Sequence, residues 1–161
     1  MNHIKTYLSV LLIITFTPIV KSQDKPNIIY ILADDMGYGD VAAYNEGCKF
    51  STPNLDRMAN EGIRFTDSHT NSSVCTPTRY GILTGRYSWR TKMKQGVTAG
   101  HSNHIIPSDR ETVASLLKKN GYNTAVIGKW HLGQDWTFKG GAHTKSEASG
   151  EDVDFTKPIK N

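Results

Sequence analysis

Short, continuous apolar runs alternate with amphipathic stretches along most of the chain. The run at residues 27–33 is rich in β-branched side chains and has strand length, which suits a strand buried on both faces of a parallel sheet. Residues 124–128 have the same character, and residues 63–66 form a shorter run of this kind. We therefore predict strands at these positions.

Helix signals lie between the runs at residues 27–33 and 63–66. Thr52 is a suitable N-cap, Pro53 suits the first helical position, and Gly62 ends the pattern. The expected inner stripe of this helix consists of Leu55, Met58 and Ala59. The pattern predicts a helix that packs by one apolar face.

Two more helices are expected before the last run. One begins near Cys75 and stops at Gly85. The other is predicted to start with a capping box of Ser108 and Glu111 and to close at Gly121. Its inward-facing side chains would be those of Val113, Leu116 and Leu117.

The order of these elements predicts the fold class. Strands that alternate with helices indicate an α/β sandwich, in which helices cover a mostly parallel central sheet. From Gly140 the chain becomes polar, small and aperiodic, so residues 140–161 are interpreted as a loop or linker. Since no closing element follows, the sequence is expected to be a truncated, amino-terminal part of a longer domain.

The first residues are expected to be a signal peptide rather than part of the fold. Lys5 precedes an apolar stretch at residues 8–20, and a small-residue cleavage pattern ends at Ser22. Residues 1–22 are too short and too weakly flanked for a membrane span. The cleavage point lacks the cysteine that a lipoprotein would need, which argues against a lipid anchor. We expect a secreted or periplasmic protein without a stable membrane anchor, or a lysosomal or extracellular one in a eukaryote.

Charge and cysteine content narrow the possible partners. The formal net charge of +4 includes Lys5 and Lys21, and the basic residues are scattered, so no nucleic-acid footprint is visible. Export makes a disulfide between Cys48 and Cys75 the default expectation. The residues around Cys75 argue for another use of its sulfur, which would leave Cys48 as a free thiol or as the partner of a cysteine outside this chain.

Adjacent carboxylates follow the first predicted strand. Asp34 and Asp35 would repel each other at the carboxyl end of that strand, where ligands gather in open α/β sheets. A hard divalent cation such as Ca²⁺ takes several carboxylate oxygens and would compensate this repulsion. Gly37 and Gly39 would let the backbone turn so that both side chains converge. The alternative is a solvated turn, because Asp and Gly are common turn residues.

A second cluster surrounds Cys75. Pro77 belongs in the first turn of a helix, so Cys75 is expected at the helix amino terminus, where the dipole favours negative charge. Arg79 lies on the same helical face and can reach an anion held there. This arrangement suits a sulfate or phosphate ester. The alternative is a structural or low-pKa cysteine with Arg79 in a surface ion pair.

The third cluster, Lys129-Trp130-His131, follows the last predicted strand. In an extended segment Lys129 and His131 point to one side. Lys129 could neutralise an anionic oxygen, and His131 could transfer a proton near neutral pH. The motif alone is weak and by itself would be interpreted as a loop, but its place beyond a strand favours a site.

Together these motifs resemble the sulfatase family. The pattern Cys75-Thr76-Pro77-Thr78-Arg79 with Thr84-Gly85 behind it is similar to that family's formylglycine signature. Three further stretches occur in the family's order: Pro26-Asn27-Ile28-Ile29 leading to Asp34-Asp35-Met36-Gly37, then Thr52-Pro53-Asn54-Leu55-Asp56, then Gly128-Lys129-Trp130-His131-Leu132-Gly133. The resemblance implies an alkaline-phosphatase-like fold, with residues 23–139 as the amino-terminal part of the catalytic domain.

The resemblance also implies a mechanism. A separate maturing enzyme would oxidise Cys75 to formylglycine, whose hydrated aldehyde attacks sulfur and later expels sulfate. Asp34, Asp35 and the modified Cys75 match calcium ligands of the family. Arg79 would steady the diol and metal site, Lys129 would bind sulfate oxygens, and His131 would position the diol or assist its proton transfers. The substrate would be a sulfated small molecule or glycan.

Some features of the family are missing before Asn161. These are a later Asp-Asn or Asp-His pair of calcium ligands and a further His and Lys around the leaving group. We therefore expect the 161-residue chain alone to be inactive. Two rival interpretations remain, a phosphate or phosphonate ester hydrolase of the same superfamily and a non-catalytic binder of sulfated glycans.

Overall fold

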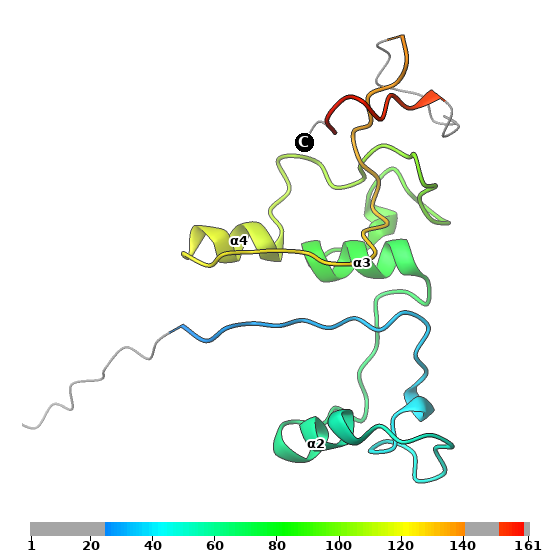
Figure 1. The fold of residues 1–161 in the computed structure, drawn as a ribbon, viewed down its shortest axis with the longest axis vertical. Helices are drawn as coiled ribbons and strands as arrows, with labels where there is room; N and C mark the ends of the chain where they lie inside the picture. The colour runs from blue at the N-terminus through cyan, green and yellow to red at the C-terminus, as the bar shows by residue number, and fades with distance from the viewer. Residues whose placement is uncertain (1–24, 141–151, 160–161) are drawn as a thin grey trace, which may run out of the picture. The chain divides into compact units, whose positions relative to one another are not determined.

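The computed structural model describes residues 25–140 and 152–159 (Figure 1). The predicted signal peptide at 1–22, and residues 141–151 and 160–161 of the predicted loop or linker at 140–161, lie outside the described residues. The chain divides into two compact units, Met1–Ala33 and Asp34–Asn161. The second unit contains η1 (Tyr38–Asp40), α2 (Pro53–Glu61), α3 (Cys75–Thr84), η2 (Ser88–Arg90) and α4 (Val113–Lys119). All candidate site residues belong to this second unit.

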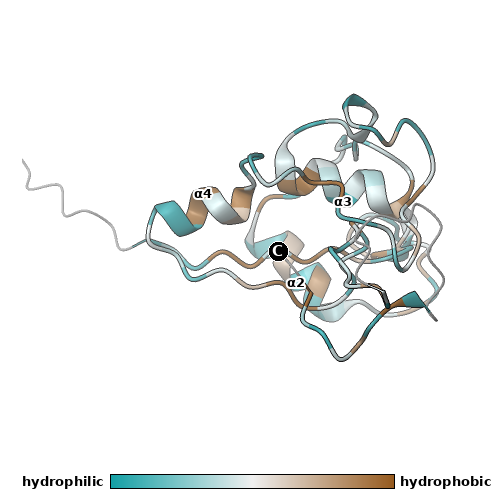
Figure 2. Cartoon of the chain, turned by 90° about the horizontal axis from the view of Figure 1, so that it is seen from above, coloured by the Kyte–Doolittle hydropathy of each residue, from teal (hydrophilic) through white to brown (hydrophobic). Residues whose placement is uncertain are grey.

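The predicted strands are not formed within residues 25–140 and 152–159. Residues 27–33, 63–66 and 124–128 have no assigned strand, and the described part of the chain has only an antiparallel bridge between Phe138 and Val153. Their apolar side chains are exposed, for example Ile29 at 85% and Ile127 at 98%. Figure 2 colours the chain by hydropathy, with hydrophobic stretches in brown. The apolar pattern predicted burial, but a strand also needs a hydrogen-bonded neighbour, which these segments lack here.

Helix α2 confirms the predicted boundaries but not the predicted stripe. Thr52 is its N-cap, Pro53 its first residue and Gly62 its C-cap. The Thr52 hydroxyl makes no cap bond; it donates to Asp56 Oδ1 at 3.0 Å and accepts from the Ala42 amide at 2.9 Å. No residue of α2 is buried, and Met58 is exposed. The helix therefore anchors a loop through its polar first turn.

Helix α3 begins and ends where the sequence predicted. Cys75 is its first residue, and Gly85 closes it in the left-handed conformation, with φ +63°. Thr76, Pro77, Thr78 and Tyr80 are buried, so the first turn, rather than a lengthwise stripe, faces the interior. This helix packs against η2 and α4.

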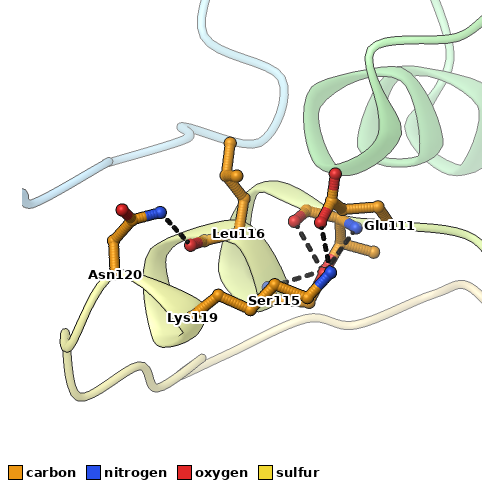
Figure 3. Close-up of polar contacts among 6 residues, drawn as sticks. Glu111, Ser115, Leu116, Lys119 and Asn120 are labelled. Atoms are coloured by element: carbon orange, nitrogen blue, oxygen red, sulfur yellow. Dashed lines mark hydrogen bonds and ion pairs between the residues drawn. The ribbon is translucent and has the colours of Figure 1, made fainter.

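Helix α4 starts later than the predicted capping box would place it. Its N-cap is Thr112, whose hydroxyl accepts from the Ser115 amide while Ser115 Oγ accepts from the Thr112 amide. Glu111 instead accepts a 2.6 Å bond from Lys119 Nζ (Figure 3). Ser108 and Glu111 have the favoured residue types, but Thr112 and Ser115 form the same reciprocal pair closer to the apolar run. Gly121 follows the helix with φ +82°, as predicted.

The interior of the second unit lies around the start of α3 and the segment after His131. Its buried apolar side chains are those of Tyr80, Leu132, Phe138 and Val153. Residues 102–105 pair with this segment, since the Ile105 amide donates to Leu132 O and the Gln134 amide to Ser102 O, both at 3.0 Å. Within residues 25–140 and 152–159, no helix has the length and apolar character needed to cross a bilayer.

Gly133 permits the close approach of these two segments. Its φ is +73°, and a Cβ added there would lie 1.9 Å from the carbonyl oxygen of Asn103. Any larger residue would therefore clash with backbone as well as adopt an unfavourable conformation. This glycine lets the chain just after His131 lie directly against residues 103–104.

Candidate active site

The site is built on the amino terminus of α3. Cys75 is the first helical residue, its N-cap is Val74, and no side chain caps the helix. The thiol is free and half-buried. Pro77 has no amide hydrogen, so it suits a turn whose N–H groups lack helical acceptors. The positive end of the helix dipole is therefore open to an anion beside residue 75.

Arg79 is held one turn further along α3. Its side chain is only 14% exposed, and Nη1 donates to the backbone oxygen of Lys129 at 2.5 Å. Nη2 lies 3.9 Å from Asp34 Oδ1. The guanidinium therefore joins the helix to both other candidate motifs. The alternative expectation of a surface ion pair does not describe this largely buried position.

Lys129 and Asp34 form the closest ion pair of the site. Lys129 Nζ donates to Asp34 Oδ2 at 2.8 Å across 95 positions of sequence. This hydrogen bond is the main reason that the pKa of Asp34 lies below its usual value, with the charges of Lys129, Arg79 and His131 contributing in the same direction. The Asp34 carboxylate therefore stays ionised near neutral pH.

The pKa of Lys129 is shifted the opposite way. The hydrogen bond to Asp34 raises it above its usual value, and the charges of Asp34 and Cys75 also raise it. Cys75 therefore belongs to the electrostatic surroundings of the ammonium group. Both members of the pair are close to half exposed, so solvent screens much of their attraction.

Asp35 differs from its neighbour in position and conformation. It is exposed and has φ +59°, a left-handed value that Asp tolerates better than most residues. We predicted that Gly37 and Gly39 would make the turn, but Gly37 has φ −78° and neither glycine has a positive φ. The backbone instead changes direction at Asp35 itself.

His131 is fixed by hydrogen bonds rather than by an extended strand end. Its φ is +55°, and Gly128 has φ +102°, so the simple alternation assumed for Lys129 and His131 does not hold. The ring Nε2 lies 2.8 Å from the carbonyl oxygen of Thr98. The carbonyl oxygen of His131 accepts bonds from Thr76 Oγ1 at 2.9 Å and Thr98 Oγ1 at 3.0 Å.

The structure thus joins motifs that lie far apart in the sequence. Asp34, Arg79 and Lys129 are in direct contact, and Cys75 and His131 lie near enough to influence the pKa values of Lys129 and Asp34, respectively. Asp35 lies beside this group without a contact that defines its side-chain role. The helix start, the guanidinium and the ammonium make a place where an anionic group would be stabilised.

The part of the chain that the structure describes does not contain a complete metal site by itself. No group of three or more His, Cys, Asp or Glu side chains is arranged to hold a metal ion there. The ionised Asp34 and the adjacent Asp35 nevertheless supply the hard oxygen donors that Ca²⁺ prefers. The donor chemistry fits calcium, and further ligands would be needed to complete its coordination.

Thr76 and Thr98 are site residues that the sequence did not reveal. Both are buried, and their hydroxyl groups are 3.3 Å apart. Thr76 adjoins Cys75, which was a usable signal, whereas Thr98 lies in a stretch without a recognisable pattern. Their importance is apparent only when the chain brings both of them to His131.

Comparison with known proteins identifies the family. The sulfatase family model matches residues 26–154, which is most of the chain. This chain belongs to the sulfatase family. It is 42% identical over 142 residues to an N-acetylgalactosamine-6-O-sulfatase of Bacteroides thetaiotaomicron and 47% identical over 108 residues to human arylsulfatase A.

A solved structure supports the same relationship for this sulfatase chain. This structure comes from work on the metabolism of multiple glycosaminoglycans by Bacteroides thetaiotaomicron, and its sequence is 46% identical to this chain. The two match with a TM-score of 0.65, over 71% of this chain and 25% of the solved chain. The match to the bacterial sulfatase covers 86% of this chain and 27% of that protein. The match to human arylsulfatase A covers 67% of this chain and 21% of that protein. The chain therefore corresponds to roughly a quarter of these relatives.

Proposed function

We propose that this chain contributes the nucleophile and anion-binding residues of a calcium-dependent sulfuric ester hydrolase. The observation that carries the proposal is the meeting of Arg79 and Lys129 with Asp34 near Cys75 at the start of α3. Membership of the sulfatase family supports ester hydrolysis at sulfur. Activity belongs to the whole protein, meaning a polypeptide that contains this chain and has the length of its relatives.

Cys75 is the proposed position of the nucleophile. Its side chain would be converted to formylglycine by a formylglycine-generating or sulfatase-maturing enzyme, and the modified group supplies an oxygen nucleophile that regenerates after sulfate leaves. The open helix terminus and the nearby Lys129 favour negative charge at this point. A half-buried position keeps the side chain accessible while the buried first turn of α3 keeps it in place.

Asp34, Asp35 and the modified Cys75 would hold the calcium ion. Bound calcium supplies Lewis-acid stabilisation of a sulfate oxygen. Lys129 and Arg79 keep Asp34 ionised and so maintain a hard oxygen donor for the metal. The rest of the calcium shell would come from parts of the whole protein outside this chain.

The remaining side chains act on the sulfate group and on protons. Lys129 donates hydrogen bonds to sulfate oxygens, and Arg79 steadies the nucleophile and metal site from the same helix. His131 positions the nucleophile or accepts a proton from it. Lys129 and Arg79 are already held beside Asp34 before substrate binds.

We infer the wider setting from the family. Residues 27–33 and 124–128 would become central strands of an alkaline-phosphatase-like, mostly parallel sheet in the whole protein, and export would follow removal of residues 1–22. The substrate is a sulfated small molecule or glycan. Among relatives, the name N-acetylgalactosamine-6-O-sulfatase supports a sulfated sugar, and arylsulfatase A supports a sulfated aromatic alcohol.

The modification of Cys75 can be tested directly. The whole protein is produced with a formylglycine-generating enzyme, and the tryptic peptide at residues 65–79 is analysed by mass spectrometry. We expect a product in which one oxygen replaces the sulfur and two hydrogens of Cys75. An unmodified thiol, in the presence of a maturing enzyme that converts a known sulfatase in parallel, would contradict the proposal and favour a non-catalytic binder.

Side-by-side hydrolysis of an aryl sulfate and an aryl phosphate tests the reaction. We expect the matured whole protein to prefer the sulfate, and Cys75→Ala to lower kcat/KM by roughly a thousandfold or more because the nucleophile is lost. Lys129→Met should cost on the order of a hundredfold, since an anion-stabilising group is removed. Lys139→Met is the matched control, as Lys139 lies outside the site and should leave the rate within about twofold. Faster phosphate hydrolysis would assign the protein to phosphorus chemistry.

A further inference from the structure

Two buried threonines hold the backbone oxygen of His131. Thr76 is fully buried and Thr98 is 7% exposed, and they come from positions 22 residues apart. Thr76 Oγ1 donates to this oxygen at 2.9 Å and Thr98 Oγ1 donates to it at 3.0 Å. The Thr98 amide also lies 3.3 Å from Thr76 Oγ1, so the three residues form one connected network.

This network maintains an unfavourable backbone conformation. His131 has φ +55°, and a non-glycine residue in the left-handed region carries a cost that its surroundings must offset. Two hydroxyl donors on one carbonyl oxygen provide such compensation. Without these two hydrogen bonds the peptide group that follows His131 could rotate, and the imidazole ring of His131 would move from its present position.

Thr98 also holds the imidazole ring of His131. Its Nε2 lies 2.8 Å from Thr98 O, and a carbonyl oxygen can only accept a hydrogen bond, so Nε2 carries the proton. In a neutral imidazole the other nitrogen is then an acceptor. Nδ1 is buried and has no hydrogen-bond partner within the described residues.

We propose that Thr98 and Thr76 are positioning residues that hold His131 as the Nε2–H tautomer, with Nδ1 kept as a free proton acceptor. Thr98 selects the tautomer through its carbonyl oxygen and, with Thr76, sets the backbone. Thr76 follows Cys75 directly, so one hydroxyl ties the histidine to the helix turn that carries the nucleophile position. The catalytic consequence rests on the proposed function, whereas the tautomer does not.

The tautomer is measured by long-range ¹H–¹⁵N spectroscopy of the ¹⁵N-histidine-labelled 161-residue chain at mildly alkaline pH. The His131 signal is identified by its loss in His131→Gln. We expect a protonated Nε2 and an unprotonated Nδ1, without exchange between the two tautomers. A protonated Nδ1, or an averaged mixture, would overturn the proposal whatever the protein's activity.

The positioning role is measured by kinetics of the matured whole protein. Thr98→Val and Thr76→Val keep side-chain volume but remove a hydroxyl, and each should lower kcat by about 10- to 100-fold with little change in KM. Thr98→Ser and Thr76→Ser retain the donor and should stay within about threefold of wild type. Thr91→Val is the control, because Thr91 Oγ1 also donates to a backbone carbonyl, that of Ser88 at 2.6 Å, outside the site.

The outcomes separate this inference from the proposed function. A valine variant that equals its serine counterpart in kcat would refute the positioning role even in an active sulfatase. Absence of sulfate hydrolysis in the wild type, together with the Nε2–H tautomer, would refute the proposed function and leave the tautomer assignment intact. Equal losses in Thr91→Val and Thr98→Val would show a general packing effect and count against the inference.

Discussion

Asp34 carries the interactions that bring the candidate site together. Its Oδ2 accepts from Lys129, and its Oδ1 faces Arg79, so one carboxylate joins residues from three separate motifs. Asp35, its neighbour in sequence, is exposed and takes no comparable part. The two adjacent residues therefore differ in the contacts that they make within this chain, and Asp35 has a left-handed backbone conformation.

The Lys129–Asp34 pair predicts a pH dependence with a definite sign. The pKa of Asp34 is lowered from 3.8, so its contribution to stability is present above that value and is lost as pH falls through the lowered folded pKa. The pKa of Lys129 is raised from 10.5, so its contribution is present below that value and is lost as pH rises through the raised folded pKa. The pair therefore contributes fully between these two pH values.

Replacing Lys129 should release Asp34 from this influence. We expect Lys129→Met to move the carboxyl titration of Asp34 upward, towards the usual value for Asp, since the main cause of its lowered pKa is removed. Carboxyl ¹³C spectra of the 161-residue chain, recorded with a chelator to exclude metal effects, measure the midpoint. Lys139→Met should leave Asp34 unchanged. An unchanged midpoint in Lys129→Met would show that the pair is not formed.

At the scale of elements, α4 shows how a helix start can be assigned to the wrong cap. Ser108 and Glu111 have the spacing of a capping box, yet the helix begins at Val113 behind Thr112 and Ser115. Glu111 is exposed and pairs with Lys119 across the surface of the helix (Figure 3). Such exposed ion pairs contribute little to the stability of a helix, whereas a cap satisfies backbone amide groups that otherwise have no hydrogen-bond partner.

Paired substitutions can distinguish the two caps. We expect Thr112→Ala to lower the stability of α4 by about 1 kcal/mol, because the Ser115 amide loses its acceptor. Ser108→Ala should change it by less than about 0.5 kcal/mol. Hydrogen exchange of the α4 amides reports this local free energy. A larger loss of protection in Ser108→Ala than in Thr112→Ala would contradict the observed helix start.

At the scale of the whole molecule, the main feature is apolar surface that the chain leaves exposed. Residues 27–33 and 124–128 have the composition of central strands, yet Ile31 and Ile127 are at least three-quarters exposed, at 77% and 98%. Exposed apolar segments of this kind mark surfaces that another part of a protein covers. In our proposal, neighbouring strands of the whole protein cover these segments.

Hydrogen exchange can test whether these segments become strands. We expect amides at 124–128 to exchange rapidly in the 161-residue chain and at least roughly a hundredfold more slowly in the whole protein, where neighbouring strands would accept their hydrogen bonds. Amides near the buried Tyr80 of α3 serve as the internal control and should be protected in both. Equal exchange at 124–128 in the two proteins would contradict the proposed sheet.

The sequence alone determined features that depend on local chemistry. Pro53 and Gly62 bounded α2, Gly85 closed α3, and the Cys-x-Pro-x-Arg pattern placed Cys75 at a helix start, because caps and backbone preferences act over a few residues. The tertiary structure alone decided which distant groups meet. The contacts of Asp34 with Lys129 and of Thr98 with His131 depend on how the chain returns to α3, which no local pattern encodes. Strand pairing is non-local for the same reason, so apolar runs alone could not establish it.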